Sequence, residues 1–145
     1  MNISEFIPIE EVQRACQELG IRDWTKLTDT TVQSEEARII QTAVGSEAMQ
    51  IPVKWFQQGL EVELEHGLQF ADANVTNNHP VLTGKIVLAH LKEMLDYYLR
   101  LNVAELEGDL LKASKKGDTA KLGRIYEKLV MARSELSDWE KSDLD

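Results

Sequence analysis

The sequence has little of what several protein classes need. Its 145 residues include three prolines and eight glycines, too few for an all-β chain with many turns. A single cysteine, Cys16, excludes an internal disulfide and argues against an oxidising compartment. Residues 1–11 lack the basic and long apolar segments of a signal peptide, and residues 81–101, the most apolar stretch, carry too many ionisable side chains to span a bilayer. These absences predict a soluble, cytoplasmic protein.

Positive charge and catalytic groups are also scarce. The chain has 16 Lys and Arg and 25 Asp and Glu, which gives a formal net charge of -9. Because nucleic-acid binding depends on neutralising phosphates with Lys and Arg, we expect no nucleic-acid partner. The "TGK" at 83–85 lacks the earlier glycine of a phosphate loop, and no base can be assigned to Cys16 or to a serine. The composition therefore favours a non-enzymatic protein without a cofactor.

The apolar spacing predicts an all-α fold of about five helices, because no strand alternation persists. We expect Ser4 and Pro8 to open the first helix and Asn78 or His79 to cap the fourth. The helices are expected to begin at Pro8, at Ser34 as a cap, at Pro52, at Pro80 and at Asp118, with stops at Gly20, Gly45 and Gly67. Trp24 and Leu27 should anchor the first connecting loop in the core.

The C-terminal half predicts a long antiparallel helical hairpin. Apolar residues continue by steps of four and three from Leu95 to Ala113, so we expect the fourth helix to run on without a break. The same steps recur from Leu122 to Trp139, after a turn at Gly117. We expect one domain, 1–145, made of N-terminal helices (1–51), a helix–loop–helix (52–101), the hairpin (102–140) and a fraying tail (141–145).

In the stretch "GLEVELEHG", residues 59–67, the three glutamates are expected to point to different sides of a helix. Successive helical residues turn by about 100°, so Glu61 and Glu65 should face solvent with Lys54 and Gln58, on the side opposite the apolar one. Glu63 should lie within about 60° of Leu60, with His66 on the next turn of the same arc. A buried carboxylate must be paired, so Glu63 requires a polar partner inside the fold.

The next helix offers such partners. His90 borders its apolar arc and Glu93 flanks it, an H-x-x-E pair facing the E-x-x-H pair of Glu63 and His66. Three interpretations stay open: a structural polar network, an iron or manganese site of ferritin-like type, or a small-ligand pocket in which His66 or His90 titrates. The register disfavours the metal, because His66 ends its helix whereas His90 lies about 15 Å into the next.

Residues 52–101 carry four motifs in series: "FQQGLEVELEHG", "NVTNNHP", "TGKIVLAHLKE" and "DYYLRL". The series resembles an uncharacterised bacterial and bacteriophage family classed as a domain of unknown function, and the flanking residues resemble a cyanobacterial version. His79 stands where members often have Asp, and "MLDYY" replaces "FPDYY", a lost proline that supports the continuous helix. The resemblance implies no activity, cofactor or partner, but it implies that the motif includes Glu63, Glu65, His66, Asn74, Thr76, Asn77, Thr83, His90, Glu93 and Tyr97.

Two functional hypotheses follow. The first is a non-enzymatic helical protein whose motif builds a buried polar core and whose hairpin contacts a protein partner or a second copy, because a two-helix arm leaves apolar flanks uncovered. An exposed Glu65 would then serve such a contact. The alternative is a metal-binding protein that uses Glu63, His66, His90 and Glu93.

Overall fold

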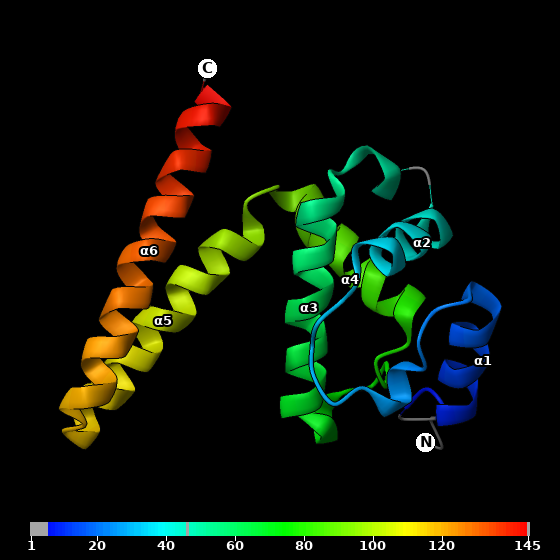
Figure 1. The fold of residues 1–145 in the computed structure, drawn as a ribbon, viewed down its shortest axis with the longest axis horizontal. Helices are drawn as coiled ribbons and strands as arrows, with labels where there is room; N and C mark the ends of the chain where they lie inside the picture. The colour runs from blue at the N-terminus through cyan, green and yellow to red at the C-terminus, as the bar shows by residue number, and fades with distance from the viewer. Residues whose placement is uncertain (1–5, 46, 145) are drawn as a thin grey trace, which may run out of the picture. The chain divides into compact units, whose positions relative to one another are not determined.

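The computed structural model describes residues 6–45 and 47–144, and within them the chain is all-helical (Figure 1). The described residues form six α-helices, one more than expected, three 3-10 turns and no strand. Residue contacts divide the chain into two compact units, with the boundary in the sequence between Glu93 and Met94. The single domain over 1–145 stays a prediction. Ser4 lies outside the described residues.

The first unit packs three helices around α4. It contains α1 (Ile9–Leu19), α2 (Ser34–Val44), α3 (Val53–Gln69) and α4 (Pro80–Glu93), with 3-10 turns η1 (Trp24–Lys26), η2 (Ala48–Gln50) and η3 (Ala71–Ala73) in the connections. Helix α4 contacts each of the other three. Apolar residues four apart on α3 form one stripe toward the core. The fully buried side chains include Val12, Ile40, Phe56, Leu60, Leu64 and Val87.

Gly84 lets α4 lie close against α2 and α3. A Cβ added at this position would lie 2.7 Å from Val44 Cγ2, 2.8 Å from Ile40 Cγ2 and 3.3 Å from Phe56 Cζ. The first two separations are well inside the contact distance of carbon atoms. The glycine of "TGK" therefore acts in helix packing.

An ion pair closes the connection between α1 and α2. Arg22 donates to the buried Glu36 from Nε (2.9 Å) and Nη2 (2.7 Å), and the Arg22 and Gln33 backbone N–H groups add bonds of 3.1 Å each. Burial acts to raise the pKa of Glu36, but these bonds outweigh it and leave the pKa below its ordinary value. Gln33 is the N-cap of α2, so the Ser34 cap was wrong by one residue.

The first unit confirms some of the other expectations and contradicts others. Trp24 is buried and anchors its loop as predicted, whereas Leu27 is only half-buried. The expectation that Glu61 faces solvent is wrong, because its Oε1 accepts a 3.0 Å bond from Val32 N. The loop at Val32 lies against that side of α3, where Gln57 Nε2 also donates to the Val32 carbonyl at 2.8 Å. A helical wheel does not take such a loop into account. Helix α3 also runs two residues past Gly67.

The second unit is the predicted antiparallel hairpin, formed by α5 (Tyr97–Lys116) and α6 (Thr119–Leu144), which pack along each other (Figure 1). Gly117 turns the chain in the left-handed conformation, with φ of 67°. Ala113, Ile125, Leu129 and Ala132 are buried in the seam. Helix α6 continues through 141–144, where we expected fraying, and Asp145 lies outside the described residues.

The expectation of one continuous fourth helix is wrong. Helix α4 ends at Glu93 and α5 begins at Tyr97, with Asp96 at its N-cap. Asp is unfavourable in the interior of a helix and is common at helix N-termini. Here the buried Asp96 carboxylate pairs with Arg100 one turn later, 2.6 Å from Nη2, and this pairing raises the pKa of Arg100. The missing proline did not remove the break. Asp96 lies at the N-cap without a side-chain cap bond, and its carboxylate pairs with Arg100 instead.

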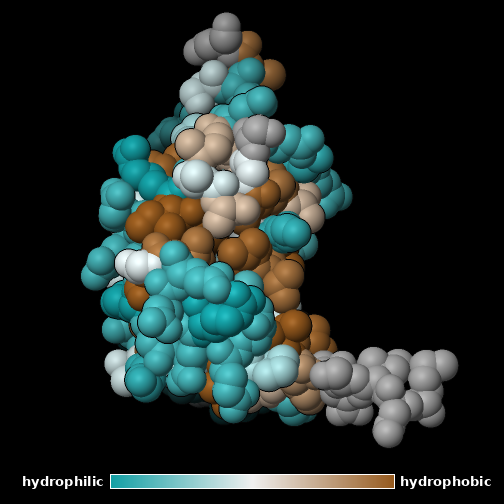
Figure 2. Space-filling view, turned by 90° about the vertical axis from the view of Figure 1, so that its right-hand side faces the viewer, coloured by the Kyte–Doolittle hydropathy of each residue, from teal (hydrophilic) through white to brown (hydrophobic). Residues whose placement is uncertain are grey.

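The outer surface of α1 is hydrophilic, as Figure 2 shows for the face that this helix turns to the viewer. Exposed residues along α1 include Glu10, Gln13, Gln17 and Glu18, while Val12, Ala15 and Cys16 are buried beneath it. Burial raises the pKa of the Cys16 thiol, which suits an inert core residue. Across the described ranges, no helix combines the length and apolarity that crossing a bilayer requires.

Candidate functional site: a pocket between α3 and α4

Glu63 lies between two histidines of the first unit. Its Oε1 is 3.6 Å from His90 Nε2 on α4, and its Oε2 is 3.9 Å from His66 Nδ1 one turn along α3. The Glu63 side chain is 15% exposed, against 37% for His66 and 32% for His90. The carboxylate therefore turns inward, as its wheel position indicates, and both imidazoles lie close to it. His90 reaches it because α3 and α4 pack side by side.

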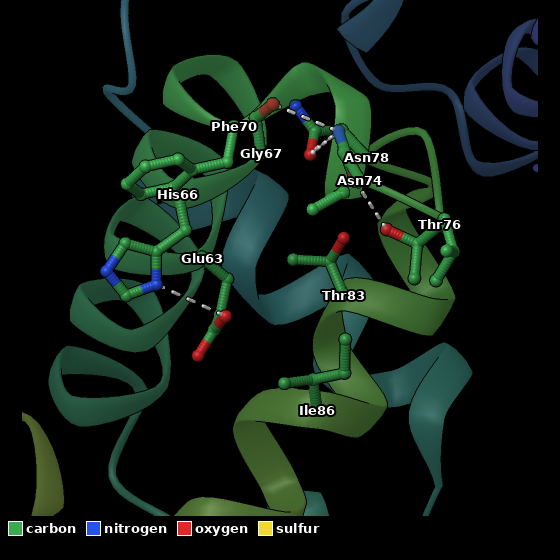
Figure 3. Close-up of a pocket in the computed structure, with 11 residues that line it drawn as sticks. Glu63, His66, Gly67, Phe70, Asn74, Thr76, Asn78, Thr83 and Ile86 are labelled. Atoms are coloured by element: carbon green, nitrogen blue, oxygen red, sulfur yellow. Dashed lines mark hydrogen bonds and ion pairs between the residues drawn. The ribbon is translucent and has the colours of Figure 1, made fainter.

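Next to Glu63 is a pocket of about 370 Å³, which we call the α3–α4 pocket (Figure 3). Its lining residues come from α3, from the 70–78 segment and from α4: Glu63, His66, Gly67, Phe70, Ala73, Asn74, Val75, Thr76, Asn78, Thr83 and Ile86. Figure 3 shows Glu63 and His66 on one side and Thr83 and Ile86 on the other. The pocket brings together five of the ten motif residues.

A cluster of amides builds the loop side of the pocket. Asn74 Nδ2 donates to Asn78 Oδ1 (2.9 Å) and to the Gly67 carbonyl (3.3 Å), and Asn74 Oδ1 accepts from Thr76 Oγ1 at 3.1 Å (Figure 3). A Cβ on Gly67 would lie 2.0 Å from Asn78 Oδ1. The glycine of "VELEHG" is thus required where the loop amides meet α3. Asn77 and Asn78 both take positive φ, at 49° and 57°, which Asn tolerates better than most residues.

His79 continues this loop as the cap of α4. Its Nδ1 accepts from Leu82 N at 3.4 Å, so His79, and not Asn78, supplies the side-chain cap. Burial lowers the pKa of His79, although Glu11 at 3.9 Å acts in the opposite direction. The N-terminal segment closes the other side of the loop: Asn77 Nδ2 donates to the Ile7 carbonyl (3.3 Å), and Ile7 N donates to the Val75 carbonyl (3.0 Å).

The remaining motif residues lie outside the pocket. Glu65 is exposed on α3, where the wheel placed it, and Glu93 is exposed at the end of α4. Tyr97 belongs to the second unit, where its ring packs edge-on against Tyr98 at 5.1 Å. Sequence reasoning missed Phe70 and Ile86 as lining residues. Their spacing offered a clue, because Phe70 follows His66 by four residues and Ile86 follows Thr83 by three.

The residues of the metal hypothesis are only partly brought together. Among residues 6–45 and 47–144, no three or more His, Cys, Asp or Glu side chains are placed to hold one ion. Glu63 contacts His66 and His90, while Glu93 is an exposed residue at the last position of α4.

The family model of DUF5661, described as a protein of unknown function, matches residues 12–107. The chain belongs to DUF5661. The DUF5661 match includes the whole α3–α4 pocket and the series of motifs in residues 52–101, so the resemblance to a family of unknown function is confirmed. The match ends within α5 and does not extend to α6. No curated protein matches the chain, and no solved structure matches it either.

Proposed function

We propose that this chain is a cytoplasmic, non-enzymatic helical protein that acts through protein contacts, and that its hairpin binds a second copy of itself. Exposed apolar side chains on the hairpin support this. Leu111 is 59% exposed, Tyr126 57% and Val130 49%. Leu111 and Tyr126 line one groove, and contiguous exposed apolar surface is characteristic of interaction sites.

The exposed apolar surface of the hairpin includes a shallow groove. It encloses about 610 Å³ near the Gly117 turn and is lined by Glu107, Leu110, Leu111, Ser114, Leu122, Gly123 and Tyr126. Gly123 has no atom within 4 Å of the position of an added Cβ, which leaves the floor of the groove open. An aromatic side chain such as Tyr126 of a second copy fits such a groove.

Charge complementarity selects a second copy in antiparallel orientation. The turn end of the hairpin, 110–128, carries six Lys or Arg and two Asp or Glu, whereas 94–109 and 129–144 together carry three basic and eight acidic residues. The hairpin therefore has a positive turn end and a negative open end. Two copies related by a twofold axis across the hairpin would place each positive end on a negative end.

The available area suits a weak dimer. The 20 residues of α5 extend over about 30 Å, and two packed helices are about 20 Å wide, so the face offers about 600 Å² per copy. Stable interfaces bury about 800 Å² per partner. We therefore expect a dimer that forms at micromolar or higher concentration and weakens as salt rises.

Sedimentation equilibrium of the full chain tests this proposal. Tyr126→Glu should abolish the dimer, whereas Met131→Glu should not, because Met131, although 74% exposed, lies about 140° around α6 from Tyr126. Replacing Lys115 and Lys116 by Glu should weaken the dimer by removing the attraction between ends. A wild-type chain that stays monomeric at millimolar concentration, or a dimer equally sensitive to both Glu substitutions, would refute this use of the hairpin.

Metal binding by Glu63, His66, His90 and Glu93 stays the alternative prediction, favoured by the contact of Glu63 with both imidazoles. Elemental analysis after purification without chelators tests it. Stoichiometric iron or manganese that is lost in Glu63→Gln would support the alternative, and a substoichiometric content would count against it.

A further inference from the structure

We propose that the α3–α4 pocket binds a small uncharged organic molecule that carries one hydrogen-bonding oxygen on an apolar ring. This site belongs to the first unit and is independent of self-association through the hairpin. The pocket volume of about 370 Å³ lies within the range of small-molecule sites. It equals the bulk volume of about a dozen waters, so it suits a ligand of about ten non-hydrogen atoms or fewer.

The hydroxyl of Thr83 supplies the polar contact. Thr83 is 2% exposed, lines the pocket and projects from α4 into the space between Glu63 and the loop side (Figure 3). Buried hydroxyl groups in proteins are usually hydrogen-bonded. Thr42 on α2 meets this need by donating to the Arg38 carbonyl one turn earlier, at 2.9 Å, whereas the Thr83 hydroxyl makes no hydrogen bond within the described part of the chain. A ligand oxygen inside the pocket would satisfy the Thr83 hydroxyl.

The ionisable groups of the pocket are already engaged with one another, which favours an uncharged ligand. Glu63 and His66 are the only ionisable side chains among the 11 lining residues. They lie 3.9 Å apart, and His90 lies 3.6 Å from the other carboxylate oxygen of Glu63. A ligand ammonium would have to displace these imidazoles, and a ligand carboxylate would face Glu63 in a lining that holds no Lys or Arg. An uncharged ligand leaves all three side chains as they are.

Apolar side chains at the mouth of the pocket supply the contact for the ring. Phe70 and Val75 are 53% and 58% exposed although both line the pocket, and Ile86 is half-buried on α4. A ligand that covers these side chains removes apolar surface from water. An aromatic ligand ring would also gain from packing against the ring of Phe70. The pocket therefore offers an apolar mouth and one hydroxyl at its buried end.

The loop side of the pocket is built before any ligand arrives. Asn74 uses both of its amide hydrogens and its carbonyl oxygen within the loop side, on Gly67, Asn78 and Thr76. The Asn74 amide therefore does not compete with Thr83 for a ligand oxygen. A preformed pocket also binds without the cost of ordering its residues.

Four probes that share a benzyl group test the inference: benzyl alcohol, toluene, the cation benzylamine and the anion phenylacetate. Titration of the ¹⁵N-labelled full chain at pH 7, followed by NMR, should give benzyl alcohol a dissociation constant of about 1 mM or tighter, as suits so small a ligand. Benzylamine and phenylacetate should bind at least about tenfold more weakly, because their charge would have to be buried in the pocket. Intermolecular NOEs should connect the ring of benzyl alcohol to the methyl groups of Val75 and Ile86.

Matched variants identify the polar contact. Thr83→Val keeps nearly the same shape and lacks the hydroxyl, so it should weaken benzyl alcohol binding about tenfold and leave toluene binding unchanged. Thr83→Ser keeps a hydroxyl and should retain binding of the alcohol. Thr42→Val removes an exposed hydroxyl that lies outside the pocket, and it should leave the binding of both probes unchanged.

Urea unfolding adds a measurement that needs no ligand. Because the fold gives the Thr83 hydroxyl no hydrogen bond within the described residues, Thr83→Val should unfold at the same urea concentration as the wild-type chain or at a higher one. A lower midpoint would show that the fold already uses this hydroxyl, and it would overturn the proposal. Equal weakening of benzyl alcohol and toluene by Thr83→Val, binding of either charged probe as tight as that of the alcohol, or no amide shifts at about 1 mM benzyl alcohol would each overturn it too. The dimer of the hairpin could fail its own test without affecting any of these outcomes.

Discussion

Replacing Gly84 by alanine tests whether the glycine of "TGK" is a packing residue. The added methyl would meet Val44 Cγ2 at 2.7 Å and Ile40 Cγ2 at 2.8 Å. Carbon atoms in contact lie about 3.5–4.0 Å apart, so each neighbour would have to retreat by about 1 Å. Ile40 and Phe56, the third neighbour, are 0% exposed and have little space to move.

Two opposing terms set the magnitude of the Gly84→Ala effect. Overpacking of a core costs about 1–3 kcal/mol. Alanine in place of glycine within a helix raises the free energy of unfolding by about 1 kcal/mol. With three close neighbours we expect the upper part of the overpacking range, and therefore a net loss of about 1–2 kcal/mol in the unfolding free energy of the first unit.

Urea unfolding followed by tryptophan fluorescence measures this loss. A Trp139→Phe background leaves Trp24 and Trp55, both in the first unit, as reporters. Gly108→Ala is the control, made in a chain that keeps Trp139 and read through that residue, because a Cβ at Gly108 meets nothing within 4 Å and should stabilise the hairpin by about 1 kcal/mol. If Gly84→Ala stabilised its unit as Gly108→Ala does, the close packing of α4 would be refuted.

Further predictions concern polar groups of the first unit. Glu36→Gln should lower the unfolding free energy by about 2 kcal/mol at pH 7, by weakening the charged bonds to Arg22. Because the folded pKa of Glu36 is lowered, its contribution is present above the ordinary carboxyl pKa of about 4 and is lost as pH falls through the lower folded pKa, so the urea curves of the two chains should approach each other in acid. His79 has a lowered folded pKa, so the unfolded chain binds the extra proton and stability should fall from pH 7 to pH 5. His79→Asn should reduce that fall, and an equal slope would contradict a neutral cap. Glu63→Ala should lower the free energy of unfolding by about 1–3 kcal/mol. An unchanged melting curve would refute the interior role of Glu63.

Much of the helical fold could be predicted from apolar spacing and from Pro and Gly positions. The hairpin followed from steps of three and four, and Gly117 marked its turn. The break before α5 could not be predicted from that periodicity. The steps of three and four from Leu95 onward show which residues pack in the hairpin, and they do not show whether the helix is continuous with α4. Asp96 was the informative residue, and its pairing with Arg100 one turn later is a clue that sequence alone offers only weakly.

For the candidate site, the wheel placed Glu63 and Glu65 on different sides, and the structure agrees. It failed for Glu61, because the bond from Val32 depends on where a loop 29 positions away in sequence lies. The Arg22–Glu36 pair was missed for the same reason, since the two residues are 14 apart and meet through a loop. Long-range polar contacts depend on tertiary packing, which local periodicity does not encode.

The end of the DUF5661 match at residue 107 divides α5 in two. A fragment cut there would keep 11 residues of α5 and lose α6, so the seam that Leu129 and Ala132 cover would meet water. Such a fragment would aggregate for reasons unrelated to the family's role. Expression of the pocket-bearing unit should therefore stop near Glu93, at the boundary between the two units, and not at the limit of family similarity.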